Sequence, residues 1–273
     1  DQKDIDVAYG ELRRFPFVKG GKEAALPILR MHDSVREFLD RGVHVDDPER
    51  YRELHRRAEV YFETRLSKAT GEETERLGLE RLYHRVCVDE DAGVVLFQEV
   101  AEELVRNRIT TQLRSLLNDV VLFPFEKENS RAWQSYYQAR LMHLTGQIAE
   151  AEQQYEDVAS KANVDAKLRS YALCDLGSVL VRTEYLGRPG GPEKAFSVIK
   201  QCQRTFGPEM DRKIVFTLSQ LRSVYNYRCE WSNSLSALSE QLAWMEQLGD
   251  RHGKVWCRTY IIGVYMIQGM WKE

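Results

Sequence analysis

The chain has 273 residues, of which 43% are hydrophobic and 30% are charged, and its formal net charge is −3. This composition predicts a folded, soluble protein and excludes an intrinsically disordered one. A net charge so close to zero gives no reason to expect a dedicated surface for nucleic acid or for an anionic membrane.

The targeting signals and the cysteines of the sequence indicate the cellular compartment to expect. The longest apolar run, residues 260–267, is far too short to span a bilayer. The chain begins without the methionine, basic region or apolar stretch of a signal peptide, and we expect this start to be a cut in a longer protein. The five cysteines form no CxxC pair, so we expect buried, reduced thiols in a cytoplasmic protein.

Residues 1–45 change between helical and extended patterns. Helix, two-stranded wing and helix are the order of elements in the second half of a winged-helix domain, and we assign residues 1–45 to a partial domain of this kind. The pattern predicts, in order, a helix at 5–12, an extended segment at 15–18, a turn at 19–22, a strand at 26–31 and a helix from Met31 to Gly42.

The tripeptide Met31-His32-Asp33 follows this wing directly. Strand, tripeptide and helix together resemble the winged-helix domain of STAND signal-transduction ATPases, the class that includes the NB-ARC proteins. In that family the histidine contacts the β-phosphate of ADP, so the resemblance implies a nucleotide-sensing role for His32. The chain has no GxxxxGK[ST] phosphate loop. We therefore expect no enzyme activity and no cofactor in this chain, and ADP or ATP only in a full-length parent.

Residues 46–130 show four apolar patterns at helical spacing, and we predict a helical linker or arm. Asp46-Asp47-Pro48-Glu49 is a strong helix start, because it combines early acids with an early proline. His55 and His84 have no further ligand at metal spacing, so we expect both on helix surfaces. Ser130 is expected to cap the helix that follows.

The stretch from Trp133 to Ala162 carries two helical patterns that meet at Gly146. Small residues at 139 and 151 would let two antiparallel helices cross closely, and the ring of Tyr155 would fill the space beyond. This arrangement resembles the tetratricopeptide-repeat hairpin. A single hairpin of this kind cannot bury its apolar face, so neighbouring hairpins are expected to stack on it.

Further hairpins are predicted over residues 131–273, which we assign to one repeat domain that is incomplete at its C-terminus. The expected crossing positions are Ala139, Gly177, Arg222 and Gly263, at spacings of 38, 45 and 41 residues. These spacings exceed the strict period of about 34, so the array is irregular, and Arg222 fits the small-residue position poorly. The fold class is therefore predicted to be all-α, a right-handed superhelix of tetratricopeptide-like hairpins.

In this repeat family the first helix of each pair lines the concave face. Tyrosine and arginine together suit a binding surface, and we expect Arg140 to meet an acidic or carboxylate-bearing partner. The alternative is that about half of the rings serve packing between repeats. The predicted partner-binding residues are Trp133, Tyr136, Tyr137, Arg140, His143, Tyr171, Asp175, Arg182, Asn226 and Tyr227.

Three functions fit the sequence. The first is a non-catalytic sensor fragment of a STAND ATPase, whose repeats bind a protein, peptide or small-molecule signal and pass it to an intramolecular ATPase domain. The second is a free-standing tetratricopeptide adaptor, and the third is the sensor region of a large transcription activator. No GxSxG or HExxH motif favours an enzyme, and no basic stripe favours direct nucleic-acid binding.

Overall fold

A computed structural model describes residues 18–23, 26–31, 42–184, 191–205 and 212–269. The chain divides into two compact units, Asp1–Asp89 and Glu90–Glu273. The division falls inside residues 46–130, which the sequence predicted as one linker. Helices α5 and α6 belong to the second unit because they pack on α7.

The first unit contains an antiparallel hairpin of β1 (Val18–Glu23) and β2 (Leu26–Met31). Strand β2 confirms the predicted strand, but the predicted turn at residues 19–22 is wrong. Gly20 and Gly21 lie within β1, opposite Leu29 and Ile28, because glycine accepts the extended backbone that the ladder requires. The predicted flanking helices lie largely outside the described residues, and so does His32.

The first unit also contains the paired helices α3 (Pro48–Leu66) and α4 (Glu72–Val88). The predicted start of α3 is confirmed: the Asp47 side chain accepts a hydrogen bond from the Arg50 amide at 3.0 Å. Tyr51 of α3 and Leu82 of α4 are buried between the helices.

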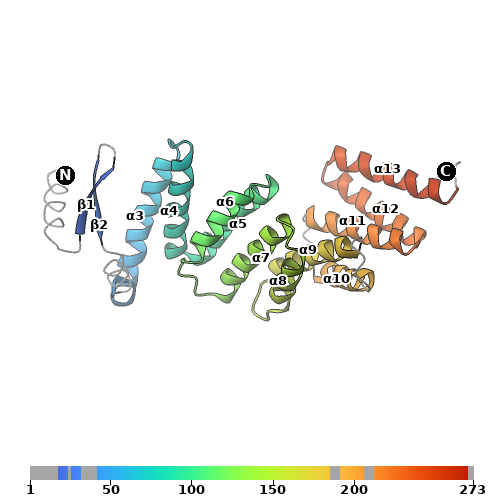
Figure 1. Ribbon diagram of the computed structural model, residues 1–273, viewed down its shortest axis with the longest axis horizontal. Coiled ribbons are helices and arrows are strands. Elements are labelled where there is room, and N and C mark those ends of the chain that lie inside the picture. The colour runs from blue at the N-terminus through green and yellow to red at the C-terminus, as the bar shows by residue number, and fades with distance from the viewer. Residues whose placement is uncertain (1–17, 24–25, 32–41, 185–190, 206–211, 270–273) are drawn as a thin grey trace. The chain divides into compact units, whose positions relative to one another are not determined.

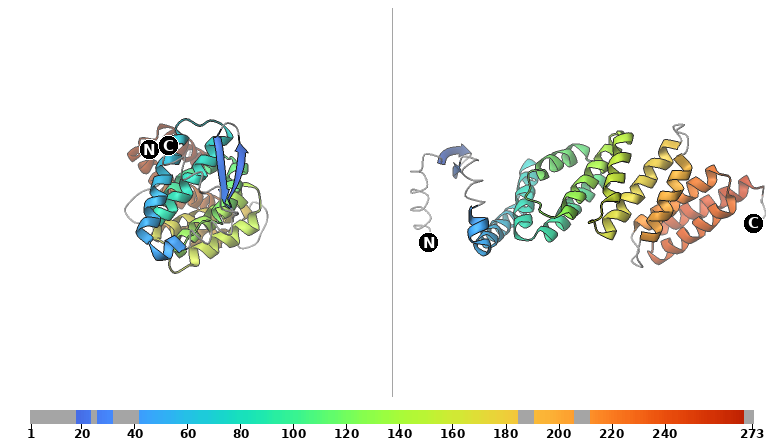
Figure 2. Two further views of the ribbon diagram at one scale, coloured as in Figure 1. Left: turned by 90° about the vertical axis from the view of Figure 1, so that its left-hand side faces the viewer. Right: turned by 90° about the horizontal axis from the view of Figure 1, so that it is seen from below.

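The second unit is built only from helices in its described part, and Figures 1 and 2 show them following one another in pairs. Each helix packs on the next, and first helices of successive pairs also touch, as in an all-α helical repeat. Their bounds are α5 (Glu90–Arg106), α6 (Thr110–Val120), α7 (Glu128–Leu144), α8 (Ile148–Ser160), α9 (Ala166–Glu184), α10 (Gly191–Thr205), α11 (Arg212–Tyr227), α12 (Trp231–Gln247) and α13 (Arg251–Ile267).

The hairpin of α7 and α8 forms as its sequence predicts. Gly146 makes the reversal with φ +85°, a conformation that glycine adopts without steric cost. Ala139, Ala151 and Tyr155 have no exposed surface. The predicted cap at Ser130 is wrong, because α7 begins at Glu128 and Ser130 is buried within its first turn.

The next pair repeats this close approach at Gly177 of α9. A methyl group built on Gly177 would lie 2.6 Å from Cγ1 of Ile199 in α10, so only glycine fits without displacement. None of the described helices is long and apolar enough to cross a membrane.

Candidate functional site

The large rings of α7 lie in the interior of the helical stack. Trp133, Tyr136 and Tyr137 are at most 2% exposed. The prediction that they contact a partner is wrong in this structure, because their rings are covered by neighbouring helices. Tyr136 packs against Tyr155 of α8 and Tyr171 of α9, with ring centres 6.0 and 6.3 Å apart. The alternative of packing between repeats holds for these three side chains.

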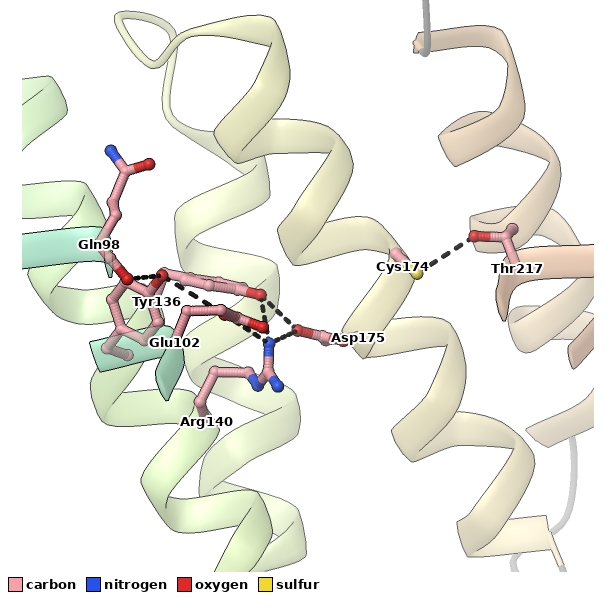
Figure 3. Close-up of polar contacts among 8 residues, drawn as sticks. Gln98, Glu102, Tyr136, Arg140, Cys174, Asp175 and Thr217 are labelled. Carbon is pink, nitrogen blue, oxygen red and sulfur yellow. Dashed lines mark hydrogen bonds and ion pairs between the residues drawn. The ribbon is translucent and has the colours of Figure 1, made fainter. Parts of the chain in front are cut away.

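Arg140 is the centre of a polar network that joins three helices (Figure 3). Its Nη1 lies 3.2 Å from Oδ2 of Asp175 in α9 and 3.7 Å from Oε2 of Glu102 in α5. The same nitrogen donates a hydrogen bond to the Tyr136 hydroxyl at 2.9 Å. One guanidinium on α7 is therefore held between carboxylates from the helices on either side of it.

The two tyrosines complete this network. The Tyr136 hydroxyl donates to Oδ2 of Asp175 at 2.6 Å. The Tyr137 hydroxyl lies 3.2 Å from the Gln98 carbonyl oxygen and 3.5 Å from Oε2 of Glu102, both in α5. Each of the two hydroxyls thus joins α7 to a different neighbouring helix.

Burial fixes the protonation of this network. Burial raises the pKa of Tyr136 well above its usual value, and the Asp175 carboxylate raises it further. Burial also raises the pKa of Tyr137, with Glu102 adding to the effect. For Arg140, burial lowers the pKa, but Asp175 and the other acidic groups outweigh it and leave a net rise. The tyrosines therefore stay neutral and the arginine stays charged.

The network is open to solvent at one edge. The side chain of Glu102 is 35% exposed, whereas those of Arg140 and Asp175 are 17% and 11% exposed. Glu102 is thus the most accessible charged side chain of the three. The expectation that Arg140 receives an acidic partner is therefore wrong, because its charge is already balanced within the protein. A cationic group of a partner would fit this edge instead.

The other predicted residues lie around the network or apart from it. Tyr171 is partly buried against Trp133, and Lys167 lies 5.6 Å from the centre of the Tyr171 ring. His143 is partly buried against Tyr155. Tyr171 therefore lies at the α7–α9 interface, and His143 lies at the contact of α7 with α8.

Two further predicted residues belong to α11. Asn226 accepts a hydrogen bond from Ser234 of α12 at 2.6 Å, and Tyr227 is 61% exposed. Arg182 lies in α9, but its side chain is outside the described part of the chain. The structure therefore does not bring the ten predicted residues to one surface.

Sequence reasoning missed a second polar cluster, in the first unit. His55 is 8% exposed and its Nδ1 lies 2.7 Å from Nδ1 of His84, so the prediction of two surface histidines is wrong. A hydrogen bond between these nitrogens needs one donor and one acceptor, so only one of the two carries a proton there. Burial, followed by the effect of His55, lowers the pKa of His84 to about 4.

Comparison with known proteins assigns no family. No family model, no curated protein and no solved structure matches the chain. Within the described residues, no three His, Cys, Asp or Glu side chains gather in a way that could hold a metal ion.

Proposed function

We propose that the chain is a non-catalytic regulatory module, the sensor part of a STAND ATPase, that binds a protein signal along α5, α7 and α9. The observation that carries this proposal is the Arg140 network, which joins helices α5, α7 and α9 and has the partly exposed carboxylate of Glu102 at its edge. A partner cation that binds Glu102 competes with Arg140 for the same carboxylate. Binding at Glu102 would weaken its ion pair with Arg140, so a bound partner would change the packing of α5 against α7.

The resemblance to STAND ATPases has one point of support in the described structure. The antiparallel hairpin β1–β2 ends at Met31, directly before His32 and Asp33. This is the place that a wing takes in the family before its nucleotide-sensing histidine. In this proposal His32 reaches ADP in a neighbouring ATPase domain of the parent protein, and the repeats report to that domain.

A matched pair of variants in α5 tests the binding edge. Proteins captured on the immobilised chain from native extract would be identified, purified and titrated against wild type, Glu102→Gln and Glu103→Gln. Both substitutions remove one negative charge from neighbouring positions of the same helix, but Glu103 is fully outside the network and exposed. We expect Glu102→Gln to weaken binding about tenfold and Glu103→Gln to leave it unchanged.

Three outcomes would contradict the proposal: no specific captured protein, equal loss with both variants, or loss with neither. Tryptophan-fluorescence melts of both variants separate a binding effect from a folding effect, since all five tryptophans belong to the second unit. A loss of affinity counts only where the melt of Glu102→Gln matches that of the wild type.

A further inference from the structure

One side of α5 is open to solvent beside the Arg140 network. The buried residues of α5, which pack on α6 and α7, are Gly93, Val94, Phe97, Ala101 and Val105. Val95 and Glu102 lie beyond the edge of this buried side. They are seven residues apart, which is nearly two helical turns, so both side chains point the same way. Val95 is 53% exposed and the Glu102 side chain is 35% exposed, so a partner could contact both.

The charges along this side of α5 change sign once. Glu99 is exposed and lies between Val95 and Glu102, four residues after the valine. Arg106 is exposed and lies one turn after Glu102. A partner that lies along α5 therefore gains from cations opposite Glu99 and Glu102 but not from a cation opposite Arg106. The favoured order along the partner is an apolar side chain opposite Val95 and cations opposite the two carboxylates.

The spacing of these contacts distinguishes a helical partner from an extended one. Val95 and Glu102 are about 10 Å apart along the axis of α5. Side chains on one face of an extended strand recur at about 6.6 Å and then about 13 Å, so a strand cannot meet both contacts. Side chains four and seven residues apart on a second helix recur at the same distances as those of α5 itself.

We infer that the partner binds this side of α5 through a basic amphipathic helix. Its apolar side chain packs on Val95, and cations four and seven positions away from it meet Glu99 and Glu102. The inference rests on the proposed function, because it names the kind of partner that would contact Glu102. It adds two contacts, at Val95 and Glu99, that lie outside the Arg140 network and can be changed without touching it.

Designed peptides can test this inference without the natural partner. The probe is a labelled, alanine-rich peptide held helical by a staple on its far side, with leucine at one position and arginine four and seven positions later. A second peptide carries the same three residues in the reverse order, so that both directions along α5 are tested. Each has a control with glutamate in place of both arginines. Fluorescence anisotropy measures the binding of each peptide to the intact chain.

Two exposed valines of α5 provide matched variants of the chain. Val95→Asn removes the proposed apolar contact, whereas Val100→Asn makes the same change about 140° further around the helix. We expect at least one arginine peptide to bind saturably and its glutamate control to bind at least about tenfold more weakly. Val95→Asn should weaken that binding about fivefold, and Val100→Asn should leave it unchanged. Urea melts of both variants must match that of the wild type.

The inference and the proposed function can fail separately. No saturable binding of either arginine peptide, equal binding of a glutamate control, or equal effects of the two valine variants would overturn the helical partner. Competition by unlabelled chain would overturn it too, because it would assign this side of α5 to a second copy. The proposed function itself fails where Glu102→Gln leaves the affinity of the captured protein unchanged. It stands without the helical partner where Glu102→Gln weakens the captured protein and Val95→Asn does not.

Discussion

Replacing each of two neighbouring buried tyrosines with phenylalanine should have opposite effects on the stability of the protein. Tyr136 and Tyr155 have no exposed surface, and their ring centres are 6.0 Å apart. The Tyr136 hydroxyl donates to Asp175 and accepts from Arg140, whereas the Tyr155 hydroxyl has no hydrogen-bond partner among the described residues. The same chemical change therefore removes two charge-assisted hydrogen bonds at one site and an unsatisfied polar atom at the other.

The size of each effect follows from these contacts. A hydrogen bond to a charged group contributes about 1.5–3 kcal/mol to stability. Arg140 and Asp175 stay 3.2 Å apart without the hydroxyl, so each keeps an ionic partner and the two losses do not add in full. We expect Tyr136→Phe to lower the free energy of unfolding by about 2 kcal/mol. Tyr155→Phe removes a group that was desolvated without compensation, so it should be neutral or stabilise by up to about 1 kcal/mol.

Urea melts followed by tryptophan fluorescence measure both variants. All five tryptophans lie after residue 90, so the signal reports the second unit, which contains both tyrosines. The slope of each melt must match that of the wild type for the midpoints to be compared as free energies. A Tyr155→Phe variant that loses as much stability as Tyr136→Phe, or a Tyr136→Phe variant without loss, would refute the role given to the network.

Two further predictions concern the α7–α8 crossing and the histidine pair. Ala151→Leu should lower the stability of the second unit by about 1–3 kcal/mol, because Ala151 is fully buried. The control is Ala149→Leu, at an exposed position of the same helix, which should cost well under about 1 kcal/mol in the same urea melt. Equal costs would mean that the crossing is not tight. The pKa of His84 is lowered, so the unfolded chain binds a proton near pH 6.5 and the folded chain only near pH 4. As the pH falls from 6.5 to 4, the free energy of unfolding of the first unit should therefore decrease by about 1–2 kcal/mol, after allowance for solvent screening. Hydrogen exchange of α3 and α4, corrected for intrinsic rates, should show this loss in wild type and a smaller one in His84→Phe; an equal loss in both would remove His84 as its cause.

The sequence predicts the helices well where local chemistry decides them. The acids and proline at Asp47-Pro48 start α3, and Gly146 turns α7 into α8, because capping and left-handed backbone depend on residues close in the chain. The small residues Ala139 and Ala151 likewise predict their own crossing, since both halves of that hairpin lie within one short stretch.

The polar contacts could not be predicted in the same way. Arg140 is paired with Glu102 and Asp175, and His55 with His84, across separations of 29 to 38 residues. Helical periodicity predicts on which face of its own helix a side chain lies. It does not predict which side chain of another helix will contact it. The sequence therefore indicated that Arg140 mattered, yet it assigned the charge to an external ligand instead of to two internal carboxylates.

The two largely buried arginines of the second unit are held in different ways. Arg140 is paired with carboxylates from the helices on either side of it, and the more exposed of these, Glu102, remains accessible to a cation from a partner. Arg222 packs on the rings of Trp256 and Tyr260, and within the described residues it forms no ion pair with a carboxylate. The sequence shows neither arrangement, because each arginine meets its neighbours from other helices only after the helices have packed.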